Sequence, residues 1–313
     1  MNPLLIKHSS TILLFLFIFN TSSSSQKEVS KSTDNELNAI SSKLQKEIVG
    51  KLTGNETIDG NVKLKSRFTK KDKALVRKYL KDLIDNLDLK AKEHHFIAQK
   101  RNPNVPIDFY KGTNIYTTLY STIESDEYIV LSAHFDSVEN CPGANDNATG
   151  VAMIYSLLSN LKNLKVRNKN VMVIFFDDEE KGLIGSDAFA KMLKEGNYNI
   201  HSVHTVDQMG WDKDGDRAIE LELPTDYLKK KYSEIAKIHN IPIHISDVDY
   251  TDHKSFRNLG YNAIGLTEEY KNKDTTPHYH APSDTYDTVD FDYLLSTSNL
   301  MYSTFKELIT EIE

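Results

Sequence analysis

The sequence predicts an α/β fold: a three-layer α/β/α sandwich around a mixed, largely parallel central sheet. Two observations indicate this class. Short apolar runs alternate with longer amphipathic stretches from residue 113 to the C-terminus. The run Val171–Phe176 is apolar at every position, as expected for a strand that is covered on both faces. No internal repeat or long linker interrupts the alternation, so one domain is expected.

Hydrophobic periodicity predicts the individual elements. Thr69 and Asp72 resemble a helix capping box, and the following residues keep helical spacing as far as Leu87. Strands are expected at residues 94–98, 113–120, 128–133, 171–176, 201–206, 218–223, 241–245 and 263–266. Further helices are expected at residues 148–161, 183–193, 225–239 and from 291 to the C-terminus.

The first 25 residues have the pattern of a secretory signal peptide. Lys7 precedes an apolar run at residues 12–19, and small polar residues follow it. This run is far shorter than the ~20 residues that span a bilayer. We therefore expect cleavage near residues 23–26, a secreted or periplasmic protein and no stable membrane anchor. An uncleaved anchor is the alternative.

The predicted mature chain divides into a short tail and one domain. Residues 26–34 are polar and expected to be flexible. A single domain is expected over residues 35–313, with a helical N-terminal part at residues 35–100 and a catalytic core at residues 101–313.

Charge is unevenly distributed along the chain. The sequence contains 38 basic and 45 acidic residues, a net charge of −7. Residues 26–100 carry a net +6 and residues 101–313 a net −14. This balance argues against a nucleic-acid partner and allows the basic part to dock on the acidic part by charge.

Cys141 is the single cysteine, which excludes an intramolecular disulfide. A buried, inert thiol is expected there, and a metal ligand or nucleophile is the alternative.

Metal-binding residue types follow several predicted strands directly. In open α/β sheets, ligands gather at the carboxyl ends of the strands. In chain order the candidates are His134, Asp136, Asp146, Asp177, Asp178, Glu179, Glu180, Asp207 and His280. Each motif alone is common as a structural pair or a solvated turn, but their order at successive strand ends favours a site.

The spacing of the first candidates suggests metal chemistry. His134 and Asp136 share one face of an extended segment. Asp136 can therefore accept a hydrogen bond from one ring nitrogen of His134 and leave the other nitrogen for a metal ion. Asp146 lies between Gly143 and Gly150, in a loop where a carboxylate could bridge two ions about 3.5 Å apart.

Glu179 and Glu180 are adjacent acids at a predicted strand end. Like charges raise each other's pKa unless a cation lies between them. In a site with two zinc ions, one carboxylate binds metal and the other is free to act as general base toward water.

A series of short motifs runs along the chain: HFDS at 134–137, GANDNATG at 143–150, FDDEEKGLIGS at 176–186, DQMG at 207–210 and YHAPSDT at 279–285. In order and content this series resembles that of the M28 family of zinc aminopeptidases. The similarity runs from about residue 112 to residue 290.

The resemblance implies specific roles. His134 and Asp207 would bind one zinc ion, Glu180 and His280 a second, and Asp146 would bridge the two. Glu179 would be the general base, and Asp136, as the partner of the His134 ring, is the other catalytic candidate. A cis peptide bond is implied between Asp146 and Asn147. The segment of residues 251–256 resembles one that lines the family's cleft, so substrate-binding candidates are Tyr250, Asp252 and His253.

These expectations define a leading function and two alternatives. The leading function is a metallo-aminopeptidase that hydrolyses peptides with a free N-terminus, using two Zn²⁺ ions per chain. A glutaminyl-peptide cyclotransferase with one zinc ion is the first alternative, because it shares this fold. A non-enzymatic binding ectodomain is the second, although all five implied ligands and the base are present. Oligomeric state and the preferred N-terminal residue do not follow from the sequence.

Overall fold

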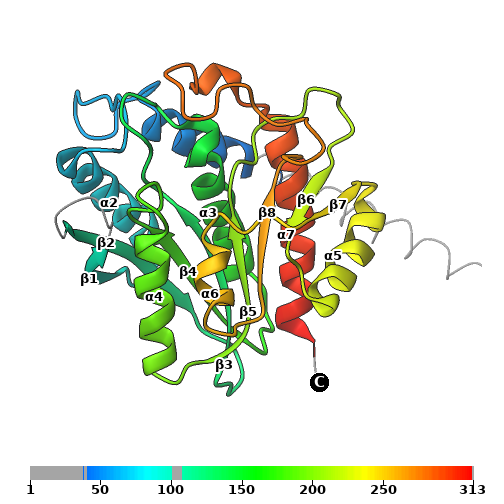
Figure 1. Cartoon of the computed structure of the whole chain (residues 1–313). Coiled ribbons are helices and arrows are strands. Elements are labelled where there is room, and N and C mark those ends of the chain that lie inside the picture. Colours follow the sequence, from blue (N-terminus) through cyan, green and yellow to red (C-terminus); the bar gives the residue numbers. More distant parts are fainter. Residues whose placement is uncertain (1–37, 39–40, 101–107, 312–313) are drawn as a thin grey trace, which may run out of the picture. The chain divides into compact units, whose positions relative to one another are not determined.

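The computed structural model of the chain describes residue 38 and residues 41–100 and 108–311 (Figure 1). Residues from Ser41 onward form one compact unit. The predicted signal peptide and the predicted flexible tail lie outside the described residues. No helix in the described ranges is long and apolar enough to cross a membrane.

An eight-stranded sheet forms the centre of this unit, in the order β1-β2-β4-β3-β5-β8-β6-β7. The pairs β3–β4, β3–β5, β5–β8 and β6–β7 are parallel, and β1–β2, β2–β4 and β6–β8 are antiparallel. This confirms the predicted mixed, largely parallel sheet. The strands are β1 Lys92–Lys100, β2 Asp108–Leu119, β3 Glu127–His134, β4 Asn170–Phe176, β5 Asn199–Val206, β6 Ile219–Glu222, β7 Ile243–Ser246 and β8 Ala263–Thr267.

Helices cover both faces of the sheet (Figure 1). One face packs against α2, α3, α5 and α7, and the other against α4 and α6. This is the predicted three-layer arrangement. Residues 41–52 are also helical. The helices are α2 Lys70–Asp85, α3 Thr149–Lys162, α4 Ile184–Glu195, α5 Asp226–His239, α6 His253–Arg257 and α7 Phe291–Thr310.

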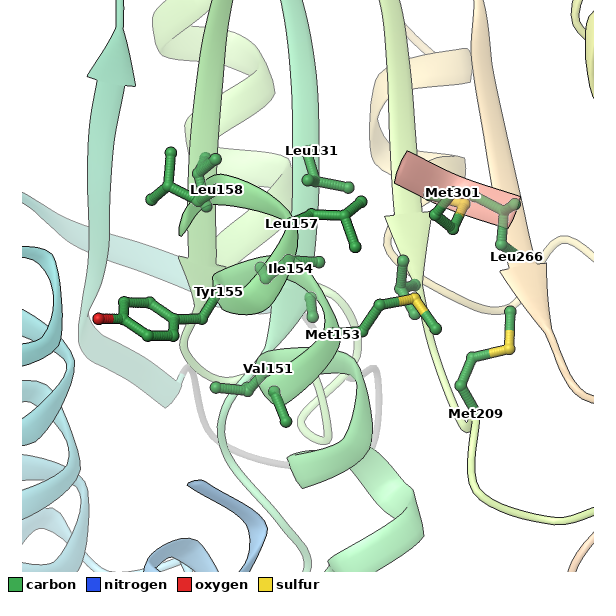
Figure 2. Close-up of a cluster of buried hydrophobic side chains, with 14 of the residues drawn as sticks. Leu131, Val151, Met153, Ile154, Tyr155, Leu157, Leu158, Met209, Leu266 and Met301 are labelled. Carbon is green, nitrogen blue, oxygen red and sulfur yellow. The ribbon is translucent and has the colours of Figure 1, made fainter. Parts of the chain in front are cut away.

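Helix α3 lies at the centre of the larger core. Its residues Val151, Ile154 and Leu158 are fully buried, and Figure 2 shows the neighbouring Leu157 beside Leu131 of β3. Strand β4 is buried at every position, which explains its unbroken apolar sequence. The start of α3 is thereby held rigidly beside the carboxyl ends of β3 and β4.

The N-terminal part docks on this core through α2. Thr69 caps the helix: its hydroxyl oxygen accepts a hydrogen bond from the backbone N–H of Asp72 at 3.1 Å, as the capping pattern predicts. The predicted helical part at residues 35–100 also contains β1, the edge strand at its end. Helix α6 was not predicted, because five residues are too few to show helical periodicity.

Candidate metal centre

The predicted ligands converge at the carboxyl ends of the central parallel strands. His134 ends β3, Glu179 and Glu180 follow β4, and Asp207 follows β5. Asp146 comes from the turn that leads into α3. Parallel strands present their carboxyl ends at one edge of the sheet, which brings distant residues together there.

Asp146 lies between two histidines. Its Oδ1 is 3.2 Å from Nε2 of His134, and its Oδ2 is 3.3 Å from Nε2 of His280. The Asp146 side chain is almost completely buried, so few water molecules can reach these oxygens. One carboxylate therefore faces two imidazoles with separate oxygens, as a bridging ligand would.

Each histidine has a second acidic neighbour. Asp207 Oδ1 lies 3.4 Å from Nε2 of His134, and Glu180 Oε2 lies 3.0 Å from Nε2 of His280. Glu179 Oε2 is 4.0 Å from the same His134 nitrogen. The pairs are those that the motif resemblance implied, with Glu179 beside them.

The crowding of acids perturbs their protonation. Burial, followed by the charges of Asp252, Asp207 and Glu180, raises the pKa of Glu179 well above its ordinary value, against the lowering effect of His134. Burial and the charge of Asp146 raise the pKa of Glu180 to about 7. Cations placed among these carboxylates would favour their ionised forms.

The cluster fits a metal ion by its donor chemistry. His134, Asp146 and Glu180 each offer a ligand atom within 4.8 Å of the others. Nε2 of His134, Oε1 of Glu180 and Oδ1 of Asp207 are buried without a hydrogen-bond partner. Buried polar atoms without partners are costly, and imidazole and carboxylate are ligands of zinc. These residues can therefore accommodate zinc.

The turn that carries Asp146 is held by side chains from distant segments. Asp284 accepts hydrogen bonds from the backbone N–H groups of Asn145 at 2.8 Å and Asp146 at 3.1 Å. The Asp146–Asn147 peptide bond is cis, as the resemblance implied. Gly143 has a φ of 65°, and a Cβ there would lie 2.4 Å from the Asp146 carbonyl oxygen, so this turn requires glycine.

Arg67 also supports the turn that carries Asp146, through hydrogen bonds from its guanidinium. Its guanidinium is completely buried and donates to the carbonyl oxygens of Phe135 at 2.6 Å and Gly143 at 2.8 Å. It also donates to the carbonyl of Pro142. The sequence does not predict this role of Arg67, because one arginine in a basic segment shows no local signal of burial.

Asp136 holds both the ring of His134 and the backbone of Glu179. Nδ1 of His134 lies 3.2 Å from the backbone oxygen of Asp136 and 3.5 Å from its Oδ1. The same Oδ1 accepts a hydrogen bond from the backbone N–H of Glu179 at 3.1 Å. Asp136 therefore contacts His134 with its main chain as well as its carboxylate, which the alternation of strand residues alone did not predict.

A buried lysine completes this arrangement. Lys73 of α2 reaches Asp177 at 2.7 Å and Asp136 at 3.8 Å and forms a short contact with Asp178. The predicted charge attraction between the basic and acidic parts of the chain is therefore present as a specific ion cluster. Lys73 is 4% exposed, which its position in a lysine-rich run did not indicate.

The remaining predicted residues occupy different places. Tyr250 lines a cavity of about 220 Å³ beside the cluster. Asp252 and His253 are buried and are not among its lining residues. A further histidine, His278, lies two residues before His280 and forms a 2.9 Å hydrogen bond with Ser283.

Cys141 is free and buried, and burial raises the pKa of its thiol to about 12, as expected of an inert thiol.

Comparisons with known proteins agree with this geometry. The model of peptidase family M28 matches residues 114–304. A probable leucine aminopeptidase of Arthroderma otae is 28% identical over 203 residues, which is 59% of this chain and 54% of that protein. The chain thus spans about half the length of the curated relatives it matches.

Solved structures share the fold. A zinc aminopeptidase from Bacillus subtilis superposes with a TM-score of 0.74 at 14% identity, covering 87% of this chain and 96% of that one. A glutaminyl cyclase from Porphyromonas gingivalis superposes with a TM-score of 0.68 at 16% identity, covering 86% and 98%.

The family match covers more than half of the chain and includes most of the cluster described above. His134, Asp146, Glu180, Asp207 and His280 all lie within the matched residues. The three-layer fold and the order of the motifs agree with the match. The chain belongs to peptidase family M28.

Proposed function

We propose that this protein is a zinc-dependent aminopeptidase that removes N-terminal residues from peptides. The observation that carries this proposal is the position of Asp146 between His134 and His280, with Glu179 beside them. His134 and Asp207 would hold one zinc ion, Glu180 and His280 the other, and Asp146 both.

Bound zinc would supply Lewis acidity toward the peptide carbonyl and the attacking water. Glu179 accepts the proton that water loses as its oxygen bonds to the carbonyl carbon. It then passes that proton to the nitrogen of the leaving amine as the C–N bond breaks. Asp136 positions Glu179 through the backbone N–H of that residue and orients the ring of His134.

The site also accounts for the free N-terminus that an aminopeptidase requires. Acidic groups line the cavity beside the metal cluster, among them Asp207 and Glu179. A protonated or metal-bound α-amine is favoured near such groups. We further propose that the protein acts outside the cytoplasm, because the first 25 residues have the pattern of an export signal.

The test is the substitution Glu179→Gln in the metal-loaded protein. Without a proton acceptor we expect kcat on aminoacyl-arylamides to fall at least about a hundredfold, while two zinc ions per chain remain. Glu195→Gln, an exposed acid at the end of α4, is the matched control and should leave both unchanged. Loss of zinc together with activity would show that Glu179 is a ligand.

A second candidate function is glutaminyl cyclisation with one zinc ion. The similarity of fold to the glutaminyl cyclase from Porphyromonas gingivalis favours keeping it. A peptide that starts with glutamine separates the two reactions. Hydrolysis releases free glutamine, whereas cyclisation releases ammonia and leaves a pyroglutamyl peptide of the original length.

A further inference from the structure

The cavity beside the metal cluster has an unusually polar wall. It has a volume of about 220 Å³, and the cluster residues Asp146, Asp207 and His280 line one side. Among the described residues that line it, Val248 is the one aliphatic side chain and none is lysine or arginine. A pocket for an aliphatic side chain is normally lined by apolar groups. This wall indicates a different kind of occupant.

Glu222 is the acidic residue of this wall that is neither a proposed metal ligand nor the proposed general base. It ends β6 and is 2% exposed. Its Oε2 accepts a hydrogen bond from the hydroxyl of Thr251 at 3.0 Å and lies 3.4 Å from Nδ1 of His253. Both Glu222 and the Thr251 that donates to its carboxyl line the cavity.

The backbone leaves room for this carboxyl. Glu222 is paired with Gly265 of the neighbouring strand β8. A Cβ at residue 265 would lie 2.2 Å from Oε2 of Glu222. Any side chain at that position would displace the carboxyl, so the glycine and the Thr251 hydroxyl together hold it in place.

Among the described residues, no lysine or arginine forms an ion pair with Glu222, whose basic contact is His253 at 3.4 Å. His253 is its nearest basic neighbour, and burial lowers the pKa of that imidazole to about 4, so the ring is neutral near pH 7. Burial and the charge of Asp207 raise the pKa of Glu222 to about 8. An ammonium or guanidinium group in the cavity would stabilise the ionised carboxylate.

We propose that this cavity receives the side chain of the substrate's N-terminal residue and that Glu222 selects a basic one, lysine or arginine. The inference rests on the proposed aminopeptidase function. Three tyrosines support it: Tyr250, Tyr270 and Tyr279 line the cavity and are each about half exposed or more. Their rings can pack against the aliphatic stem of a lysine and attract its cation.

The test compares two substrates that differ only in the cation. Lysyl-arylamide and norleucyl-arylamide have side chains with the same four-carbon stem, and norleucine lacks the terminal ammonium group. A charge-assisted hydrogen bond in a buried pocket predicts a kcat/KM about ten- to a hundredfold higher for lysine in the unaltered enzyme. Equal rates, or a preference for norleucine, would overturn the proposal without any variant.

The substitution Glu222→Gln tests whether this residue causes the preference for lysine over norleucine. We expect the lysine preference to fall at least about tenfold, while hydrolysis of the norleucyl substrate stays within about threefold. The exposed Glu234→Gln on α5 removes the same charge at a distance and should keep the preference. Equal losses on both substrates would mean that Glu222 has only a structural role.

The experiments distinguish an error in the proposed aminopeptidase function from an error in the proposed specificity. If neither arylamide is hydrolysed, the aminopeptidase proposal is wrong, and calorimetry with lysinamide and norleucinamide then tests the pocket alone. Tighter binding of lysinamide that Glu222→Gln abolishes supports a basic-side-chain site. Equal binding of the two amides overturns it.

Discussion

His204 makes the stability of the folded protein depend on pH. The imidazole is completely buried in β5, where it contacts the hydroxyl of Tyr232 at 2.8 Å and that of Ser202 at 2.9 Å. Burial lowers its pKa from the ordinary 6.5 to about 3. The folded protein therefore holds His204 neutral under conditions in which an unfolded chain would protonate it.

The sign of the resulting pH dependence follows directly. Below pH 6.5 His204 is protonated in the unfolded state, whereas in the folded state it stays neutral down to about pH 3. The free energy of unfolding therefore falls as the pH falls through this range. One such group contributes a slope of about 1.4 kcal/mol per pH unit. We expect His204→Gln to flatten the fall by this amount, measured by urea unfolding between pH 6 and pH 4. A variant at the exposed His95 should keep the original slope.

At the scale of an element, helix α2 connects the N-terminal part to the metal centre. Its Lys73 reaches between Asp177 and Asp178, and Arg77 approaches Asp177 at 3.4 Å. Both acids belong to the segment between β4 and Glu179. The helix thus neutralises carboxylates next to Glu179, the proposed general base.

Removal of this cation should be costly. Lys73→Met leaves the buried Asp136, Asp177 and Asp178 without their common partner, and we expect the free energy of unfolding to fall by about 3–5 kcal/mol. Denaturant titration measures the change. Lys78→Met, on the exposed side of the same helix, should stay within about 0.5 kcal/mol. A loss below 1 kcal/mol at residue 73 would show that the ion cluster adds no net stability.

At the scale of the whole molecule, the segment before the family match is part of the structural core. Residues 41–100 precede the matched range and contribute Arg67, Lys73 and the edge strand β1. Ile48, Leu52 and Leu80 of this segment are fully buried. The matched range alone would expose their contact surface and the edge of β2.

Truncation tests this dependence. We expect a chain that starts at residue 41 to give a cooperative thermal transition and to elute as a compact species. A chain that starts at residue 101 should aggregate, because it exposes apolar surface and an unpaired strand edge. Circular dichroism and size-exclusion chromatography measure both properties. A folded, active chain from residue 101 would make the N-terminal part dispensable.

Most elements could be predicted because their signals are local. The unbroken apolar run of β4 and the helical spacing of α2 and α3 each lie within one stretch of sequence. The proposed metal ligands could also be located, because parallel strands bring their carboxyl ends to one edge. The five-residue helix α6 was missed, since less than two turns show no period.

The sequence by itself determined the fold class, the order of the strands and helices along the chain, and which residues gather at the proposed metal centre. It could do so because periodicity and strand-end motifs are properties of neighbouring residues. Only the tertiary structure decided the burial and the contacts of Arg67, Lys73 and Glu222. Each is a charged residue in an ordinary polar pattern, and its burial depends on segments that are distant along the chain. Pairing of β6 with β8, and docking of α2 on the loop after β4, create those environments.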